Sequence, residues 1–152
     1  MKFILFFTFI LASVYSKAQT PYNFYNLFLE NGLSDARVAD IVQDKYGFMW
    51  FATPNGLNRY DGYVIKNFNA GNNLSSLPSN NIMSLYSAKN GDLWIGTTKG
   101  VVTFNFATEK FSSFDTSYKE AAEVANLAIS DITADKNGNI YAATLKGIFS
   151  YT

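Results

Sequence analysis

The 152-residue sequence contains no cysteine and no histidine. Their absence excludes a Ser-His-Asp triad, a Cys-His pair and a zinc site built from the usual ligands. Disulfide bonds and phosphorylation on histidine are excluded within this chain as well. We therefore expect no catalytic residue, no metal site and no cofactor here.

An excess of either charge is also lacking, since 12 basic residues balance 12 acidic ones. A nucleic-acid-binding domain shows a basic patch and a high pI, whereas the pI here is about 6.2. Nucleic acid is therefore not an expected partner. Hydrophobic residues make up 48% of the chain and aromatic residues 17%. An aromatic-rich globular chain with glycine turns favours an all-β fold.

The N-terminus has the pattern of a secretory signal peptide. Lys2 precedes the apolar run Phe3–Tyr15, and the small residues Ser16 and Ala18 stand three and one positions before a cut. An uncleaved membrane anchor is the alternative, but a span needs about 20 apolar residues. We expect residues 1–18 to be removed and the protein to be exported.

Three segments of the chain align without gaps, at residues 44–61, 88–105 and 135–152. In each segment a glycine is followed at intervals of three residues by an aromatic residue, a threonine and a second glycine. These residues are Gly47, Trp50, Thr53 and Gly56, then Gly91, Trp94, Thr97 and Gly100, then Gly138, Tyr141, Thr144 and Gly147. Three matching copies indicate an internal repeat.

Each repeat has the pattern of four short antiparallel strands. In the first repeat we expect strands at residues 38–43, 48–53, 57–60 and 63–68, with a type I turn at residues 44–47 and a second turn at residues 53–56. Four-stranded units of 40–50 residues in series are typical of propeller blades. The sequence therefore predicts a partial β-propeller of about three four-stranded antiparallel blades after a cleaved signal peptide.

These patterns divide the chain into five parts and give the repeated residues structural roles. The parts are the signal peptide (1–18), an opening strand (19–31), blade 1 (32–75), blade 2 (76–123) and an incomplete blade 3 (124–152). We expect the repeated aromatic ring to pack between neighbouring blades rather than to contact a ligand. The repeated glycines are expected to form turns rather than to bind phosphate.

The stretch Gly32–Tyr63, GLSDARVADIVQDKYGFMWFATPNGLNRYDGY, resembles the opening of a two-component regulator propeller. The repeat of this family has Asp, a turn Gly, Trp, Gly-Thr and Gly-Leu at fixed spacing. The first repeat follows the pattern from Asp44 onwards. The second repeat has Ala88 in place of Asp, and the third departs at Tyr141 and Ala143. The family comprises the N-terminal periplasmic sensor regions of Bacteroidetes hybrid two-component histidine kinases.

The resemblance implies a non-catalytic periplasmic module that takes part in signal transduction and senses carbohydrate fragments. Full-length relatives continue into further blades, a membrane helix, a histidine kinase, a receiver and a DNA-binding region. The implied partners are an oligosaccharide, the remaining blades and downstream region of the same polypeptide, and a second copy in a full-length homodimer. Residues 22–29 would close the ring as an outer strand.

In this interpretation the chain is an N-terminal fragment of the sensor. We expect it to be poorly soluble or to associate, because three blades leave two apolar faces uncovered.

Asn55, Asn58, Arg59 and Asp61 are the candidate ligand-binding residues, expected near the loops of one blade. Amide and guanidinium groups can hydrogen-bond sugar hydroxyls, and aromatic rings can stack on the apolar face of a sugar. A secreted propeller enzyme acting on polysaccharide is an alternative, although the lack of histidine removes a frequent catalytic base. A short non-catalytic binding or scaffold repeat protein is the third interpretation.

Overall fold

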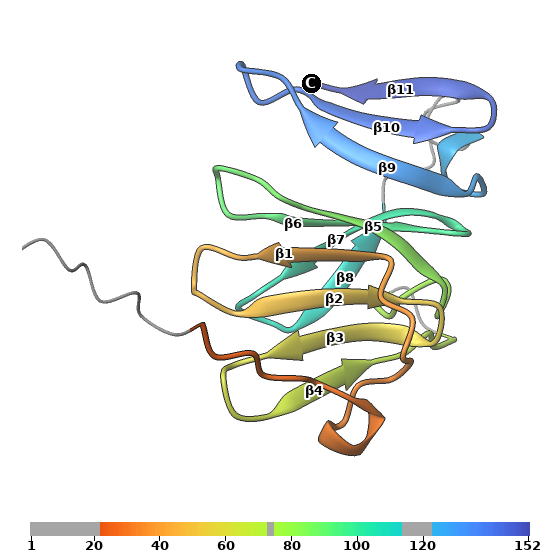
Figure 1. Cartoon of the computed structure of the whole chain (residues 1–152). Helices are drawn as coiled ribbons and strands as arrows, with labels where there is room; N and C mark the ends of the chain where they lie inside the picture. Colours follow the sequence, from red (N-terminus) through yellow and green to blue (C-terminus); the bar gives the residue numbers. More distant parts are fainter. Residues whose placement is uncertain (1–21, 73–74, 114–122) are drawn as a thin grey trace, which may run out of the picture.

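The computed structural model describes residues 22–72, 75–113 and 123–152. The predicted signal peptide at residues 1–18 lies outside these residues. Within them, three antiparallel sheets follow one another in chain order and stack face against face (Figure 1). This arrangement confirms the prediction of an all-β partial propeller.

Each sheet is built from strands that are consecutive in sequence. The first sheet contains β1 (Asp40–Gln43), β2 (Met49–Thr53), β3 (Gly56–Tyr60) and β4 (Ile65–Phe68). The second contains β5 (Ile82–Ser87), β6 (Leu93–Thr97), β7 (Gly100–Asn105) and β8 (Lys110–Ser113). The third contains β9 (Ile129–Ala134), β10 (Ile140–Thr144) and β11 (Gly147–Tyr151).

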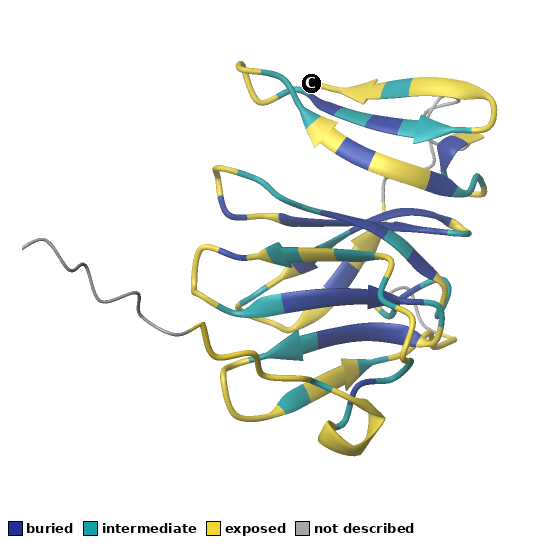
Figure 2. Ribbon diagram, in the orientation of Figure 1, coloured by how far each residue is buried: buried dark blue, intermediate teal, exposed yellow. Residues whose placement is uncertain are grey.

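Two apolar cores lie between the sheets, and we call these contacts the first and second seams. The first seam, between the first and second sheets, is centred on Trp50, Leu85 and Phe104. The second seam, between the second and third sheets, is centred on Trp94 and Ile132. Figure 2 shows buried residues concentrated along these contacts, whereas β11 is mostly exposed. Burying apolar area in this way is the main force that holds successive sheets together.

The first strands of the first two sheets are joined directly. Oδ2 of Asp40 in β1 accepts a hydrogen bond from the backbone N–H of Leu85 in β5 at 2.7 Å. This contact connects neighbouring blades in addition to the aromatic packing of the first seam.

From Tyr22 onwards, where the structure describes the segment, the expected opening strand is not formed. Residues 22–28 have no regular secondary structure, and Leu29–Asn31 is a short 3₁₀ helix. A strand is held by hydrogen bonds to a neighbouring strand, and none of the described strands pairs with this segment. The ring-closing role of residues 22–29 stays a prediction. Among the residues that the structure describes, no helix has the length and apolar character needed to cross a bilayer.

Candidate functional site

The aspartate of the repeat holds both a turn and an aromatic ring. Oδ1 of Asp44 accepts the backbone N–H groups of Tyr46 and Phe48 at 2.8 and 3.0 Å. Its Oδ2 accepts the indole N–H of Trp50 at 2.7 Å. The sequence pattern assigned this residue to the turn alone, and its bond to the ring was missed.

The second repeat lacks this carboxylate because Ala88 occupies the equivalent position. In the third repeat Asp135 returns, and its Oδ1 accepts the N–H groups of Asn137 and Asn139 at 2.8 and 2.9 Å. Desolvation opposes ionisation of Asp135, but the amide of Asn139 and the backbone N–H groups of the turn hold its pKa below the ordinary value. The second repeat is thus the one in which the aromatic ring stands without a neighbouring aspartate of the motif.

The threonine of the repeat has a structural role as well. In each repeat its Oγ1 donates to the carbonyl of the glycine three residues later, at 2.7, 2.9 and 2.9 Å for Thr53, Thr97 and Thr144. The same oxygen accepts the backbone N–H two residues later. The repeated Thr and Gly therefore form a fixed turn between the second and third strands of each sheet.

Of the four predicted ligand-binding residues, Asn58 and Arg59 lie within strand β3 rather than in a loop. Asn58 is fully buried, and its Oδ1 accepts the N–H of Ser34 at 2.9 Å while its Nδ2 donates to the carbonyl of Phe51 at 3.2 Å. The amide of Asn58 is thus already paired inside the protein. The expectation was that the four residues lie near the loops of one blade, and these two lie on the strand that connects those loops.

Asn55 and Asp61 lie beyond opposite ends of β3, so the four residues do not form one cluster. Nδ2 of Asn55 donates to the carbonyl of Ser34 at 3.1 Å. Oδ1 of Asp61 accepts the N–H groups of Val64 and Tyr63, which lower its pKa. Sugar binding by these residues stays a prediction.

Arg59 belongs to a charged cluster that closes the first seam. Its guanidinium lies 2.9 Å from Glu109, in the turn between β7 and β8, and 4.7 Å from the ring centroid of Phe48. Lys66, the partner of Arg59 across the β3–β4 ladder, also contacts Glu109. Hydrogen bonds from Lys66 and then Arg59 hold the pKa of Glu109 below its ordinary value.

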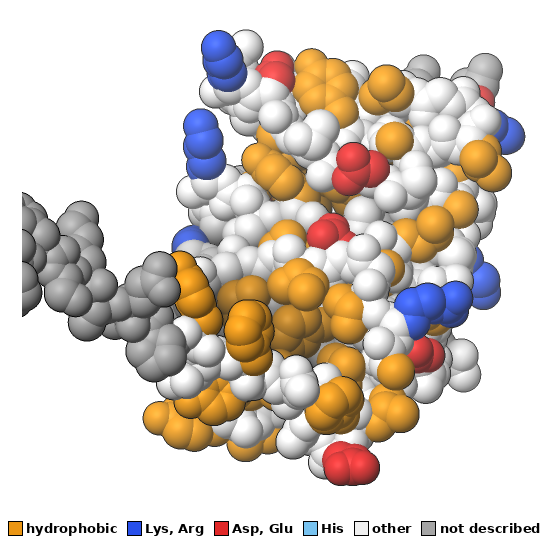
Figure 3. Space-filling model, in the orientation of Figure 1, with side chains coloured by type: hydrophobic (Ala, Val, Ile, Leu, Met, Phe, Trp, Pro, Cys, Tyr) orange, Lys and Arg blue, Asp and Glu red, His pale blue; other side chains and the backbone are white. Residues whose placement is uncertain are grey.

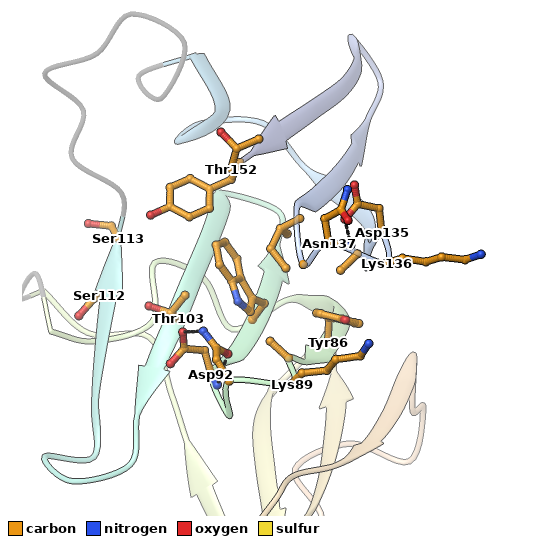
Figure 4. A pocket seen from close by; sticks show the side chains of 17 residues that line it. Tyr86, Lys89, Asp92, Thr103, Ser112, Ser113, Asp135, Lys136, Asn137 and Thr152 are labelled. Atoms are coloured by element: carbon orange, nitrogen blue, oxygen red, sulfur yellow. Dashed lines mark hydrogen bonds between the residues drawn. The ribbon is translucent and has the colours of Figure 1, made fainter.

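The second seam has a different composition at the equivalent positions. Thr103 takes the place of Arg59, and Ser112, its ladder partner, takes the place of Lys66. A cavity of about 650 Å³ lies here. It is lined on one side by Thr103, Ser112 and Ser113, and on another by Tyr86 and Lys89 (Figure 4). This cavity is the candidate functional site.

Two lysines line the cavity, Lys89 from the β5–β6 turn and Lys136 from the β9–β10 turn. Among the described residues, the ion pairs are those that Arg59 and Lys66 make with Glu109. Lys89 and Lys136 therefore form no ion pair with a carboxylate in the described part of the chain. Asp92, which also lines the cavity, accepts a hydrogen bond from Nδ2 of Asn90 at 2.7 Å.

Successive four-stranded antiparallel sheets joined in this way define the class of β-propeller proteins. Residues 32–55 and 76–99 match the model of the family described as two component regulator propeller. The two matched segments lie in the first and second repeats of the chain.

Three other proteins are similar to the chain. A stretch of 75 residues, 47% of the chain, is 36% identical to Histidine kinase P4 of Formosa agariphila and covers 6% of that protein. The extracellular domain of a hybrid two component system from Bacteroides thetaiotaomicron is 25% identical, with a TM-score of 0.70 over 87% of this chain. That of a one component system from the same organism is 24% identical, with a TM-score of 0.64 over 86% of this chain, and shows the fold alone.

The chain spans about a fifth of both extracellular domains, at 20% and 19% of their lengths.

The cavity was missed by sequence reasoning because residues of two repeats form it. One signal was available in the alignment of the repeats. Small residues stand in the second repeat where the first has Asp44, Arg59 and Lys66. A loss of volume at two paired strand positions and one adjoining turn predicts a gap between sheets, provided that the pairing of the strands is known.

Proposed function

We propose that this chain is part of the periplasmic ligand-sensing propeller of a hybrid two-component system and is itself non-catalytic. The observation that carries the proposal is the pair of family repeats, together with the structural likeness to an extracellular domain of such a system over 87% of the chain. The signal-peptide pattern at residues 1–18 supports export to the periplasm.

A carbohydrate fragment is the proposed ligand. The cavity at the second seam combines aromatic rings with hydroxyl groups, and its volume falls within the range of about 300–1,000 Å³ that is usual for ligand sites. Rings suit the C–H face of a sugar, and hydroxyl and amide groups suit its hydroxyls. This site is separate from the residues that the sequence pattern favoured.

Sequencing the gene beyond codon 152 tests the sensor assignment. We expect the reading frame to continue through further repeats, one apolar span of about 20 residues and a kinase region that contains histidine. A stop codon directly after codon 152 would contradict a sensor encoded in one polypeptide.

Calorimetric titration of the leader-free chain with a panel of oligosaccharides tests the ligand class. Trp94→Phe is expected to weaken binding, because it reduces the ring area at the cavity wall. Asn55→Ala tests whether the ligand binds instead at the residues of the first blade that the sequence favoured. An effect of Asn55→Ala without an effect of Trp94→Phe would move the site back to the first blade.

A further inference from the structure

We propose that Asn137, in the turn between β9 and β10, is a site of spontaneous covalent modification, at which the amide is converted to aspartate or isoaspartate. The chemistry is independent of the proposed ligand. An asparagine followed by glycine is the pair that this reaction requires, and the sequence contains four. They are Asn31-Gly32, Asn55-Gly56, Asn90-Gly91 and Asn137-Gly138.

The reaction begins when the deprotonated backbone nitrogen of Gly138 attacks Cγ of the Asn137 amide. The new N–Cγ bond closes a five-membered succinimide ring, and the Cγ–Nδ2 bond breaks. The leaving NH₂ group takes up one proton and departs as ammonia, which balances the proton that the backbone nitrogen gave up. Water then adds to either carbonyl of the ring and opens it. Glycine favours the attack, because it has no Cβ to crowd the nitrogen.

The side-chain amide of Asn137 is free to turn toward this nitrogen. It makes no hydrogen bond to another residue in the described part of the chain, and Asn137 is bonded to Asp135 through its backbone N–H alone. The other three amides are held. Oδ1 of Asn31 accepts the N–H of Phe28 at 2.9 Å, Nδ2 of Asn55 donates to the carbonyl of Ser34 at 3.1 Å, and Nδ2 of Asn90 donates to Oδ2 of Asp92 at 2.7 Å.

The attacking nitrogen is also held least firmly at this pair. The backbone N–H groups of Gly56 and Gly91 donate to carbonyls at 2.8 Å, and that of Gly32 does so at 3.0 Å. The N–H of Gly138 donates to the carbonyl of Asp135 at 3.2 Å. This length lies at the long end of the range for backbone hydrogen bonds. Less interaction is therefore lost when the Gly138 nitrogen turns toward Cγ.

Asn90 stands at the same position of the repeat as Asn137, and its turn is covered by the neighbouring sheet. Nζ of Lys45 donates to the carbonyl of Asn90 at 3.1 Å, and the Lys45 side chain lies where a Cβ of Gly91 would be. Gly91 is buried. Gly138 is exposed, and a Cβ there would meet nothing within 4 Å. One turn is thus shielded by the sheet before it, and the other is open.

Water reaches the open turn from the surface. The turns between the first and second strands lie along one edge of the molecule, from which basic side chains project (Figure 3). Asn137 is exposed and also lines the cavity at the second seam (Figure 4). The product therefore adds a carboxylate to the cavity wall beside Asp135. Isoaspartate would also add a methylene to the backbone of the turn that Asp135 closes.

The test follows the four pairs by peptide mapping and mass spectrometry of the full chain, kept in mildly alkaline buffer. Asn90 is the internal control, because it and Asn137 share the sequence Lys-Asn-Gly. Asn137 should be converted about fivefold or more faster than Asn90, the factor for one hydrogen bond that must break before the attack. In denaturant, where neither turn is held, the two should react at similar rates.

Three variants test the cause. Asp92→Ala removes the acceptor of the Asn90 side chain, and Lys45→Ala uncovers Gly91. Each should raise the rate at Asn90 toward that at Asn137, and both replace exposed residues, so the fold should persist. Asn137→Gln identifies the reacting residue, because conversion at this turn should stop when the ring to be closed has six members.

Equal rates at Asn90 and Asn137 in the folded chain would overturn the proposal, as would faster conversion at Asn31 or Asn55. A difference between Asn90 and Asn137 that persists in denaturant would overturn the structural cause. So would an unchanged rate at Asn90 in both Asp92→Ala and Lys45→Ala. Thermal unfolding of each variant shows that the rates compared belong to folded chains. The sequencing test of the sensor assignment is independent of all these outcomes.

Discussion

The indole N–H of Trp50 donates to the carboxylate of Asp44 across 2.7 Å, and both residues are buried. The same carboxylate closes the turn that precedes the ring. One residue of the repeat therefore sets the position of the largest side chain in the first seam, where Trp50 lies 5.0 Å from Phe104 of the next sheet between ring centroids.

Asp44→Ala should destabilise the chain by about 2–3 kcal/mol, because it removes charge-assisted hydrogen bonds and leaves a buried indole N–H without its acceptor. Chemical denaturation of Asp44→Ala, Trp50→Phe and the double variant measures the coupling. We expect a coupling free energy of about 1 kcal/mol or more. Additive effects of the two single substitutions would show that the bond contributes nothing beyond the turn.

Thr97→Val should cost about 1–3 kcal/mol of folding free energy. The change keeps the shape but leaves the N–H of Lys99 and the carbonyl of Gly100 without the hydroxyl that they share. Thr144→Val is the matched control, since its hydroxyl makes the same two bonds at an exposed turn where water can replace them. Thermal unfolding of both variants measures the loss of folding free energy at each site. Equal losses at the two sites would contradict the argument that burial makes Thr97 the more costly one to replace.

Gly100→Ala should destabilise the protein more than Gly138→Ala. Both glycines have positive φ, of 94° and 93°, so both substitutions carry backbone strain of about 1 kcal/mol or more. A Cβ at Gly100 would also lie 2.6 Å from the carbonyl oxygen of Ala125, whereas a Cβ at Gly138 meets nothing within 4 Å. A difference of at least about 1 kcal/mol in unfolding free energy is expected; similar values would show that strain alone governs both turns.

The contribution of Glu109 to stability should depend on pH. Its pKa is lowered in the folded protein from an ordinary value of 4.5, so the stabilisation is complete above that pH and is lost as the pH falls through the folded value. Because the side chain is 40% exposed, the effect should not exceed about 1 kcal/mol. In denaturant titrations, the free energies of unfolding of wild type and Glu109→Gln should differ at pH 6 and converge at pH 3. A constant difference would assign the effect to packing.

The sequence was most informative about the strands and turns. The expected strand at residues 57–60 is observed at 56–60, and that at 48–53 is observed at 49–53. These predictions succeed because turn glycines and the aromatic pattern act over a few residues. The predicted strand at 63–68 begins later, at Ile65, because Asp61 binds the backbone of Tyr63 and Val64 and thereby forms the turn.

The sequence was least informative about which side chains meet between sheets. Arg59 was expected to face a ligand, yet it pairs with Glu109, which lies 50 positions along the chain. The pattern of residues within one repeat does not show how one sheet packs against the next. That packing decides whether a polar residue lies in a seam or lines a cavity. Asn58 illustrates the same limit, since its buried amide accepts a hydrogen bond from Ser34, 24 positions away in the chain.

The strand order within each sheet has a consequence for how the chain acquires its structure. Among the described strands, every ladder joins strands that are neighbours in sequence, so most pairing requires only short loops to close. All-β proteins fold slowly when contacts between distant segments must form first. In this chain such contacts form mainly when one completed sheet docks against another. We therefore expect each sheet to assemble as it leaves the ribosome and to wait, with one apolar face open, for the sheet that follows.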